Sequence, residues 1–154
     1  MSEREQKLID LGYPIERTTP EGVLVDAVVI TESIVYASGQ VPFDGEMLVS
    51  KGKVPSQVDI KEATRAAALC AANVLRAVHK HLGTLDKVER VARITGYVNS
   101  DPDFTEQHLV INGASQLVLD VFGPAGRHAR TALGMAQLPL GASVEVEMIL
   151  ELKP

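Results

Sequence analysis

Histidine and cysteine are the residue types here with the widest chemical range, and their spacing offers no metal centre. The histidines are His79, His81, His108 and His128. His79 and His81 stand two residues apart in a segment expected to be helical, so they point about 200° apart around the helix axis and cannot bind one ion. The only cysteine cannot form a disulfide or a multi-thiolate site. We expect no metal, solvated surface positions for the histidines, and a Cys70 that packs as a small hydrophobic residue.

A second arrangement lies near the C-terminus. Arg130 is followed by Leu138-Pro139 and then by Val144-Glu-Val-Glu147, and both segments have the composition of strands. If these strands pair as a hairpin, the glutamates approach Arg130 from the partner strand. The turn and any bulge set the register, so pairing alone does not decide whether Arg130 and Glu145 meet. Two interpretations remain open: a solvated cross-strand ion pair worth less than about 1 kcal/mol, or a functional site.

Composition narrows the class of protein. The chain has 154 residues, 15 Lys and Arg against 20 Asp and Glu, and a net charge of -5, as expected for a soluble single domain. Binding to nucleic acid needs clustered positive charge, so a nucleic-acid partner is disfavoured. No apolar run reaches the roughly 20 residues that span a membrane, and residues 1–10 do not look like a secretory signal, so we expect a cytoplasmic protein. Only six aromatic residues are present, so we expect flat faces of small apolar residues that pack between subunits as well as within one.

Hydrophobic spacing predicts the elements that would position Arg130 and Glu145. The sequence predicts helices at 2–11, 57–81 and 105–122, strands at 22–30, 34–39, 87–99, 128–136 and 143–152, and a short strand near 47–49. Residues 57–81 repeat apolar positions every three or four residues, whereas 143–152 alternate. The turn at 100–103 is expected to cap the helix that follows it. This order predicts an α+β domain in which both main helices cover one side of a mixed sheet.

Several of these segments resemble one family. They are Tyr36-Ala-Ser-Gly-Gln-Val-Pro42, Asn112, Ala129-Arg130, Leu138-Pro139 and Val144-Glu-Val-Glu147. Together they resemble the Rid/YjgF family of reactive-intermediate deaminases, which is also described as endoribonuclease L-PSP-like, along nearly the whole chain beyond Gly22. The resemblance implies a chorismate-mutase-like fold and a homotrimer with its sites in the clefts between subunits. Residues 1–154 would then form a single domain with a helical extension at about 1–20.

The resemblance also implies a reaction. Family members hydrolyse enamines and imines, such as 2-imino acids, to 2-keto acids and ammonia without a metal or an organic cofactor. By motif position, Arg130 would bind the substrate carboxylate and Glu145 would orient the water and accept its proton. Gly39 and Ala132 would complete the substrate site, and Asn112 would add a hydrogen bond from the facing subunit. A protein that only binds or senses small carboxylates is the alternative function, and an endoribonuclease is disfavoured by the acidic balance.

Three departures from the family pattern indicate a divergent branch. Ala132 stands where well-studied members often have Cys, and no Pro-Tyr element occurs between Glu21 and Ala27. The loop at 123–128 differs from the shorter family form and brings Arg127 and His128 beside Arg130. We therefore expect a wider pocket that is adapted to another substrate.

Overall fold

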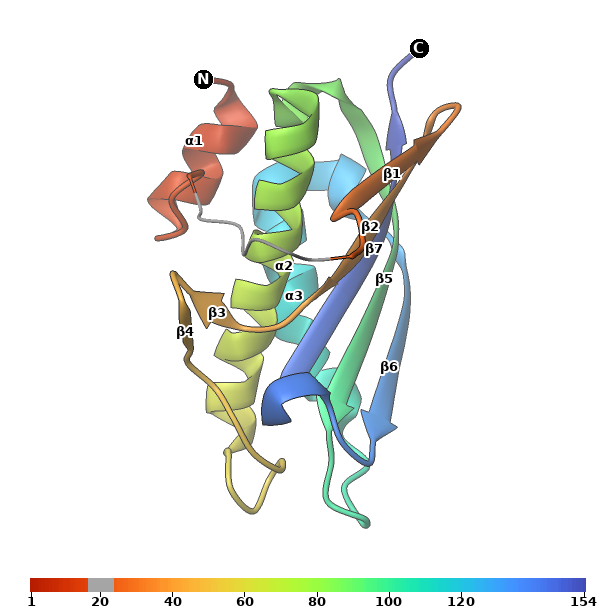
Figure 1. Ribbon diagram of the computed structural model, residues 1–154. Coiled ribbons are helices and arrows are strands. Elements are labelled where there is room, and N and C mark those ends of the chain that lie inside the picture. Colours follow the sequence, from red (N-terminus) through yellow and green to blue (C-terminus); the bar gives the residue numbers. More distant parts are fainter. Residues whose placement is uncertain (17–23) are drawn as a thin grey trace.

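The computed structural model describes residues 1–16 and 24–154 (Figure 1). The elements are α1 (Glu3–Asp10), β1 (Val28–Thr31), β2 (Ile34–Gln40), β3 (Phe43–Asp44), β4 (Met47–Leu48), α2 (Ile60–Leu82), β5 (Val88–Asn99), α3 (Gln107–Phe122), β6 (Ala129–Met135) and β7 (Val144–Leu152). Five strands form one sheet in the order β1-β2-β7-β5-β6, and β3 and β4 form a separate hairpin. Helices α2 and α3 cover one face of the sheet (Figure 1). The predicted α+β class with helices on one face of a mixed sheet is confirmed. The strand predicted at 22–30 is shorter than expected, because residues 24–27 are not strand and β1 begins at Val28; residues 22 and 23 lie outside the described residues.

Helix α2 illustrates why these elements form where they do. It begins after Asp59, whose carboxylate accepts a hydrogen bond from the Glu62 N–H at 2.7 Å, and it ends at Gly83, which adopts a φ of +82°. Its buried face is built mainly from small residues, including Ala63, Ala66, Ala67, Cys70 and Ala71. Cys70 is fully buried, as predicted. Small side chains let α2 lie close to the sheet, where the apolar residues of β7 complete the core.

The last two strands do not pair as a hairpin, because β5 lies between them. Strand β5 runs parallel to β6 and antiparallel to β7. The reason is the crossover through α3, which joins β5 to β6 and makes them parallel neighbours. The predicted cap of α3 is also wrong, since its N-cap residue is Glu106 and no side chain caps it.

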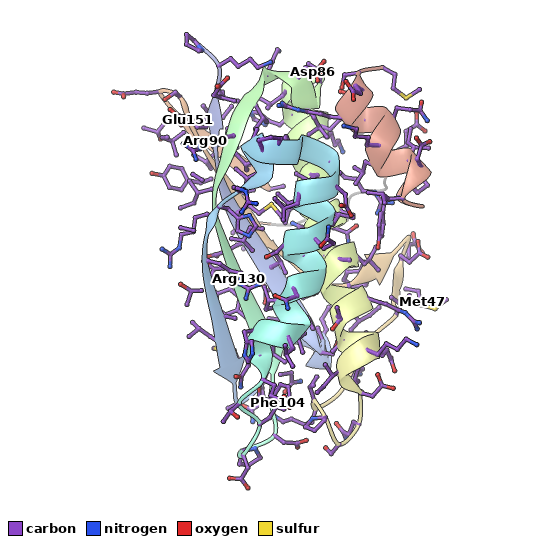
Figure 2. All side chains as sticks on the ribbon, turned by 180° about the vertical axis from the view of Figure 1, so that it is seen from behind. Met47, Asp86, Arg90, Phe104, Arg130 and Glu151 are labelled. Carbon is purple, nitrogen blue, oxygen red and sulfur yellow. The ribbon has the colours of Figure 1, made fainter. Side chains whose placement is uncertain are left out.

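The N-terminal helix α1 packs on the side of the helical layer that faces away from the sheet (Figures 1 and 2). Its first turn is closed by a capping box between Ser2 and Glu5. Glu5 is 3% exposed and accepts hydrogen bonds from the Thr84 hydroxyl at 2.7 Å and the Leu85 N–H at 2.9 Å. Arg4 lies over the Phe122 ring, 4.7 Å from its centroid. These contacts fix α1 to the loop before β5 and to the last residue of α3. Among the described residues, no helix is both long enough and apolar enough to cross a bilayer.

Candidate functional site

Arg130 lies on the edge strand β6 and points toward α3 (Figure 2). Its Nη1 donates to Asn112 Oδ1 at 2.9 Å and to Ser115 Oγ at 3.1 Å, and its Nη2 donates to the His108 carbonyl at 3.4 Å. Asn112 and Ser115 are three residues apart, so both face β6 from the same side of the helix. Strand β6 and helix α3 together therefore hold the guanidinium in a fixed orientation.

All three acceptors are neutral, so the charge of Arg130 is not compensated. Within residues 1–16 and 24–154, the ion pairs join Lys7 to Glu3 and His79 to Glu5, and neither involves Arg130. The Nε of Arg130 donates to no side chain or carbonyl in these ranges. A guanidinium binds a carboxylate through two parallel N–H donors, and Nε with Nη2 forms one such edge. The arrangement is suited to a small anion.

Sequence reasoning missed a second contact network beside Arg130. The hydroxyl of Ser115 lies 2.9 Å from His128 Nε2, and His128 Nδ1 lies 2.6 Å from the Gly126 carbonyl. A carbonyl only accepts hydrogen bonds, so Nδ1 carries a proton, and in the neutral imidazole Nε2 is the acceptor that faces Ser115. The expectation that all histidines are solvated is therefore wrong for His128, which is half-buried and bonded through both ring nitrogens. Ser115 follows Asn112 by three residues, which places both side chains on one face of a helix. That spacing is the sequence signal that could have identified this network.

Glu145 lies on the opposite face of the sheet from Arg130. In the strand register, Arg130 aligns with Ile94, which is buried under the helices, whereas Glu145 aligns with Tyr97 on the other face. On that face Glu145 meets Gly39, because a Cβ on Gly39 would overlap Glu145 Oε1. A Cβ at this position of β2 would displace the Glu145 carboxylate, so Gly39 leaves room for the carboxylate where it lies.

The environment of Glu145 favours its neutral form. Burial raises the pKa of the half-buried Glu145, and the nearby charge of Glu147 raises that pKa further. The Tyr97 hydroxyl donates to Glu147 Oε1 at 3.1 Å. Burial and this interaction with Glu147 also raise the pKa of Tyr97. A carboxylate with a raised pKa is a better proton acceptor than an ordinary one.

The predicted site residues thus form two groups. Arg130 and Asn112 meet on the helical side of the sheet, and Ala132 lies two residues further along the same face of β6. Gly39 and Glu145 meet on the other side. A cross-strand ion pair between Arg130 and Glu145 is ruled out, because β5 separates their strands and their side chains leave opposite faces. A site that uses both groups would have to take them from two different chains.

No group of three or more His, Cys, Asp or Glu side chains in the described part of the chain is placed to hold a metal ion. The groups that meet around Arg130 are its guanidinium, the amide of Asn112, the hydroxyl of Ser115 and the imidazole of His128.

Fold and motif positions define the class of protein. A mixed sheet with two helices on one face is the architecture of YjgF-type proteins. The sequence profile of the family described as endoribonuclease L-PSP matches residues 15–152. The chain therefore belongs to the endoribonuclease L-PSP family, which is the Rid/YjgF family.

Individual relatives support this placement. Protein TCP17 of Trypanosoma cruzi is 46% identical over 118 residues, which are 76% of this chain and 74% of that protein. The crystal structure of Atu1372 from Agrobacterium tumefaciens, a protein of unknown function, is 44% identical with a TM-score of 0.89, covering 97% of this chain and 92% of that one. A Shewanella oneidensis protein is 25% identical with a TM-score of 0.92 over 98% and 100% of the two chains. Escherichia coli TdcF with bound serine shares the fold at 19% identity, with a TM-score of 0.59 over 90% and 95%.

Proposed function

We propose that the protein hydrolyses small imines or enamines, namely 2-imino acids, to 2-keto acids and ammonia, at clefts between the subunits of a homotrimer. Arg130 binds the substrate carboxylate, and Glu145 of a neighbouring subunit orients the attacking water. One observation carries this proposal: the half-buried Arg130 guanidinium is held by neutral oxygens and has no acidic partner among the described residues.

The reaction fits these groups. In a 2-imino acid the imine carbon is bonded to the carboxylate carbon. Binding of the carboxylate by Arg130 therefore also fixes the position of the carbon that reacts. Glu145 takes a proton as the water oxygen bonds to that carbon, and this proton then passes to the imine nitrogen to give an amino alcohol. The hydroxyl proton of the amino alcohol passes through Glu145 to the amine, the C–N bond breaks, and ammonia leaves the keto group behind. The raised pKa of Glu145 supports its role as the base. Asn112 fixes the orientation of the guanidinium from α3.

The test is ammonia release from 2-iminobutyrate, generated in the assay by a dehydratase. We expect wild type to accelerate release above the uncatalysed rate. Arg130→Ala should lower kcat/KM at least about 30-fold, because it removes charge-assisted hydrogen bonds worth roughly 2 kcal/mol. Arg90→Ala is the matched control, since Arg90 is exposed and lies far from Arg130 (Figure 2). Absence of acceleration by wild type across several imino acids would overturn the proposal.

A second candidate function is carboxylate binding without turnover. The separation of Arg130 from Glu145 within one chain favours it, because the anion site is complete on one face without a catalytic carboxylate. A relative of the same fold, TdcF, also has serine bound. Calorimetric titration with 2-oxobutanoate distinguishes the two functions. Saturable binding that Arg130→Ala abolishes, without any acceleration of ammonia release, would establish the binding function instead.

A further inference from the structure

We propose that Ser115 is a nucleophile activated by His128, and that these residues with Arg130 form an acyl-transfer site for small carboxylic esters. This activity goes beyond imine hydrolysis and does not depend on it. The three residues come from the middle of α3, the loop after it and the edge strand β6.

The hydroxyl of Ser115 is oriented for proton transfer. A serine or threonine inside a helix commonly bonds the carbonyl four residues earlier, as Thr64 does with Ile60 at 2.7 Å in α2. Ser115 instead lies 2.9 Å from His128 Nε2, within the range in which a general base takes a proton. The side chain therefore points away from its own helix and toward a base.

A third group holds the base in the required tautomer. The Gly126 carbonyl lies 2.6 Å from His128 Nδ1 and keeps the proton there, so Nε2 is the free acceptor. Gly126 is itself buried against α3, where a Cβ would lie 2.6 Å from the Val118 carbonyl oxygen. This close contact between Gly126 and α3 holds the loop in place, and the loop in turn holds the His128 imidazole. A nucleophile, a base and an orienting acceptor are the parts that a hydroxyl nucleophile needs.

Arg130 supplies positive charge at the nucleophile. Its Nη1 donates to Ser115 Oγ at 3.1 Å, which favours the serine oxygen as negative charge develops on it. The carbonyl oxygen of an acyl group attacked by Ser115 would lie within reach of the same guanidinium. Preorganised donors of this kind stabilise the oxyanion of acyl transfer. No ion pair from a described acidic residue neutralises Arg130, so its charge is available.

The reaction has two steps, the acylation of Ser115 and the hydrolysis of the acyl-serine. Ser115 Oγ bonds to the ester carbonyl carbon while its proton passes to His128 Nε2, and the bond to the alcohol oxygen breaks as the alcohol takes that proton. Water then attacks the acyl-serine and gives a proton to His128, which returns it to Ser115 Oγ. The products are the free acid and the alcohol.

The experiment uses p-nitrophenyl acetate with the full chain. We expect a burst of p-nitrophenol and one acetyl group on Ser115, identified by mass spectrometry of the peptide. Ser115→Ala should abolish that adduct, and His128→Gln should slow its formation about 100-fold. Ser56→Ala and His81→Gln are matched controls at exposed positions, and both should react like wild type.

Peptide mapping of the wild-type protein keeps the test independent of whether the variants fold. Acetylation confined to lysines, or an adduct on Ser115 that forms equally fast in a folded His128→Gln protein, would overturn the proposal. Thermal melting of each variant establishes that it is folded. Ammonia release measured on the same preparations separates this activity from imine hydrolysis, because either activity can be lost while the other remains.

Discussion

Because the hydrogen-bond partners of Arg130 are neutral, its positive charge remains available to bind an anionic ligand. Asn112 offers an amide oxygen 2.9 Å from Nη1, where a carboxylate would form an internal ion pair instead. The near-isosteric change Asn112→Asp tests this directly. We expect the Kd for 2-oxobutanoate to rise about 10-fold or more, because the new carboxylate competes with the ligand for the guanidinium.

Calorimetric titration measures this effect. Gln116→Glu is the matched control, because it adds the same charge to the exposed side of α3 without touching Arg130. Equal affinities in wild type and Asn112→Asp would contradict the role given to Arg130.

Glu147 adds to the effect of burial on the pKa of Glu145. Burial and the Glu147 charge raise the pKa of Glu145, so its basic form appears only as pH rises through that raised value. We expect kcat/KM for imine hydrolysis to rise over the same pH range. Glu147→Gln removes the neighbouring charge and should move the inflection to lower pH, while the contribution of burial remains. A pH profile of both proteins checks this, and an inflection that stays in place or moves upward counts against Glu145 as the base.

At the scale of elements, local patterns were sufficient to predict helices and strands but not their pairing. The apolar repeat of α2 and the alternation of β7 reflect burial on one face, which is a property of each segment alone. The position of β5 between β6 and β7 depends on the crossover through α3, which no strand pattern encodes. That pairing separates Arg130 from Glu145, so the motif positions suggested both residues without showing that they lie on opposite faces of the sheet. The contact between Ser115 and His128 could not be predicted from the sequence, because it depends on how the loop between α3 and β6 folds.

The docking of α1 gives a prediction about acid stability. Burial alone would raise the pKa of Glu5, but hydrogen bonds from Thr84, Ser2 and Leu85 outweigh it and lower that pKa from 4.5 to about 2. A lowered pKa means that Glu5 stabilises the fold above its unfolded pKa and loses this effect as pH falls from 4.5 toward 2. At pH 7, Glu5→Gln should reduce the free energy of unfolding by about 1.5 to 3 kcal/mol.

Urea unfolding at several pH values measures this difference. The difference between wild type and Glu5→Gln should shrink as the pH is lowered through that window. Glu3→Gln, at an exposed position paired with Lys7, is the control and should change stability by less than about 0.5 kcal/mol. A difference that persists unchanged at pH 2 would refute the assignment to ionised Glu5.

At the scale of the whole molecule, the face of the sheet without helices carries exposed apolar side chains. Val29 and Tyr36 are each 49% exposed and Leu133 is 43% exposed, and all three lie on the face of Glu145. Apolar groups on such a face favour association with other copies of the chain. We expect a homotrimer, which would also bring Glu145 of one subunit toward Arg130 of another.

Light scattering after size exclusion tests the assembly. Wild type should have a mass of about 50 kDa, three times the 16.6 kDa chain. Tyr36→Glu should shift the protein toward the monomer, because it places a charge on the apolar face. Met47→Glu is the control, since Met47 is also exposed but lies on the far side of the molecule (Figure 2). A monomeric wild type with full deaminase activity would contradict the two-chain site.

The most direct test of the central claim, that Arg130 binds a small carboxylate, is a crystal structure of the protein with 2-oxobutanoate bound. We predict that the ligand carboxylate contacts Nε and Nη2 of Arg130 at about 2.8 Å, beside Asn112, with Glu145 of a second subunit facing the keto carbon. A ligand bound elsewhere, for example in the cavity beside Lys51 and Lys53, with Arg130 left unoccupied, would contradict the claim.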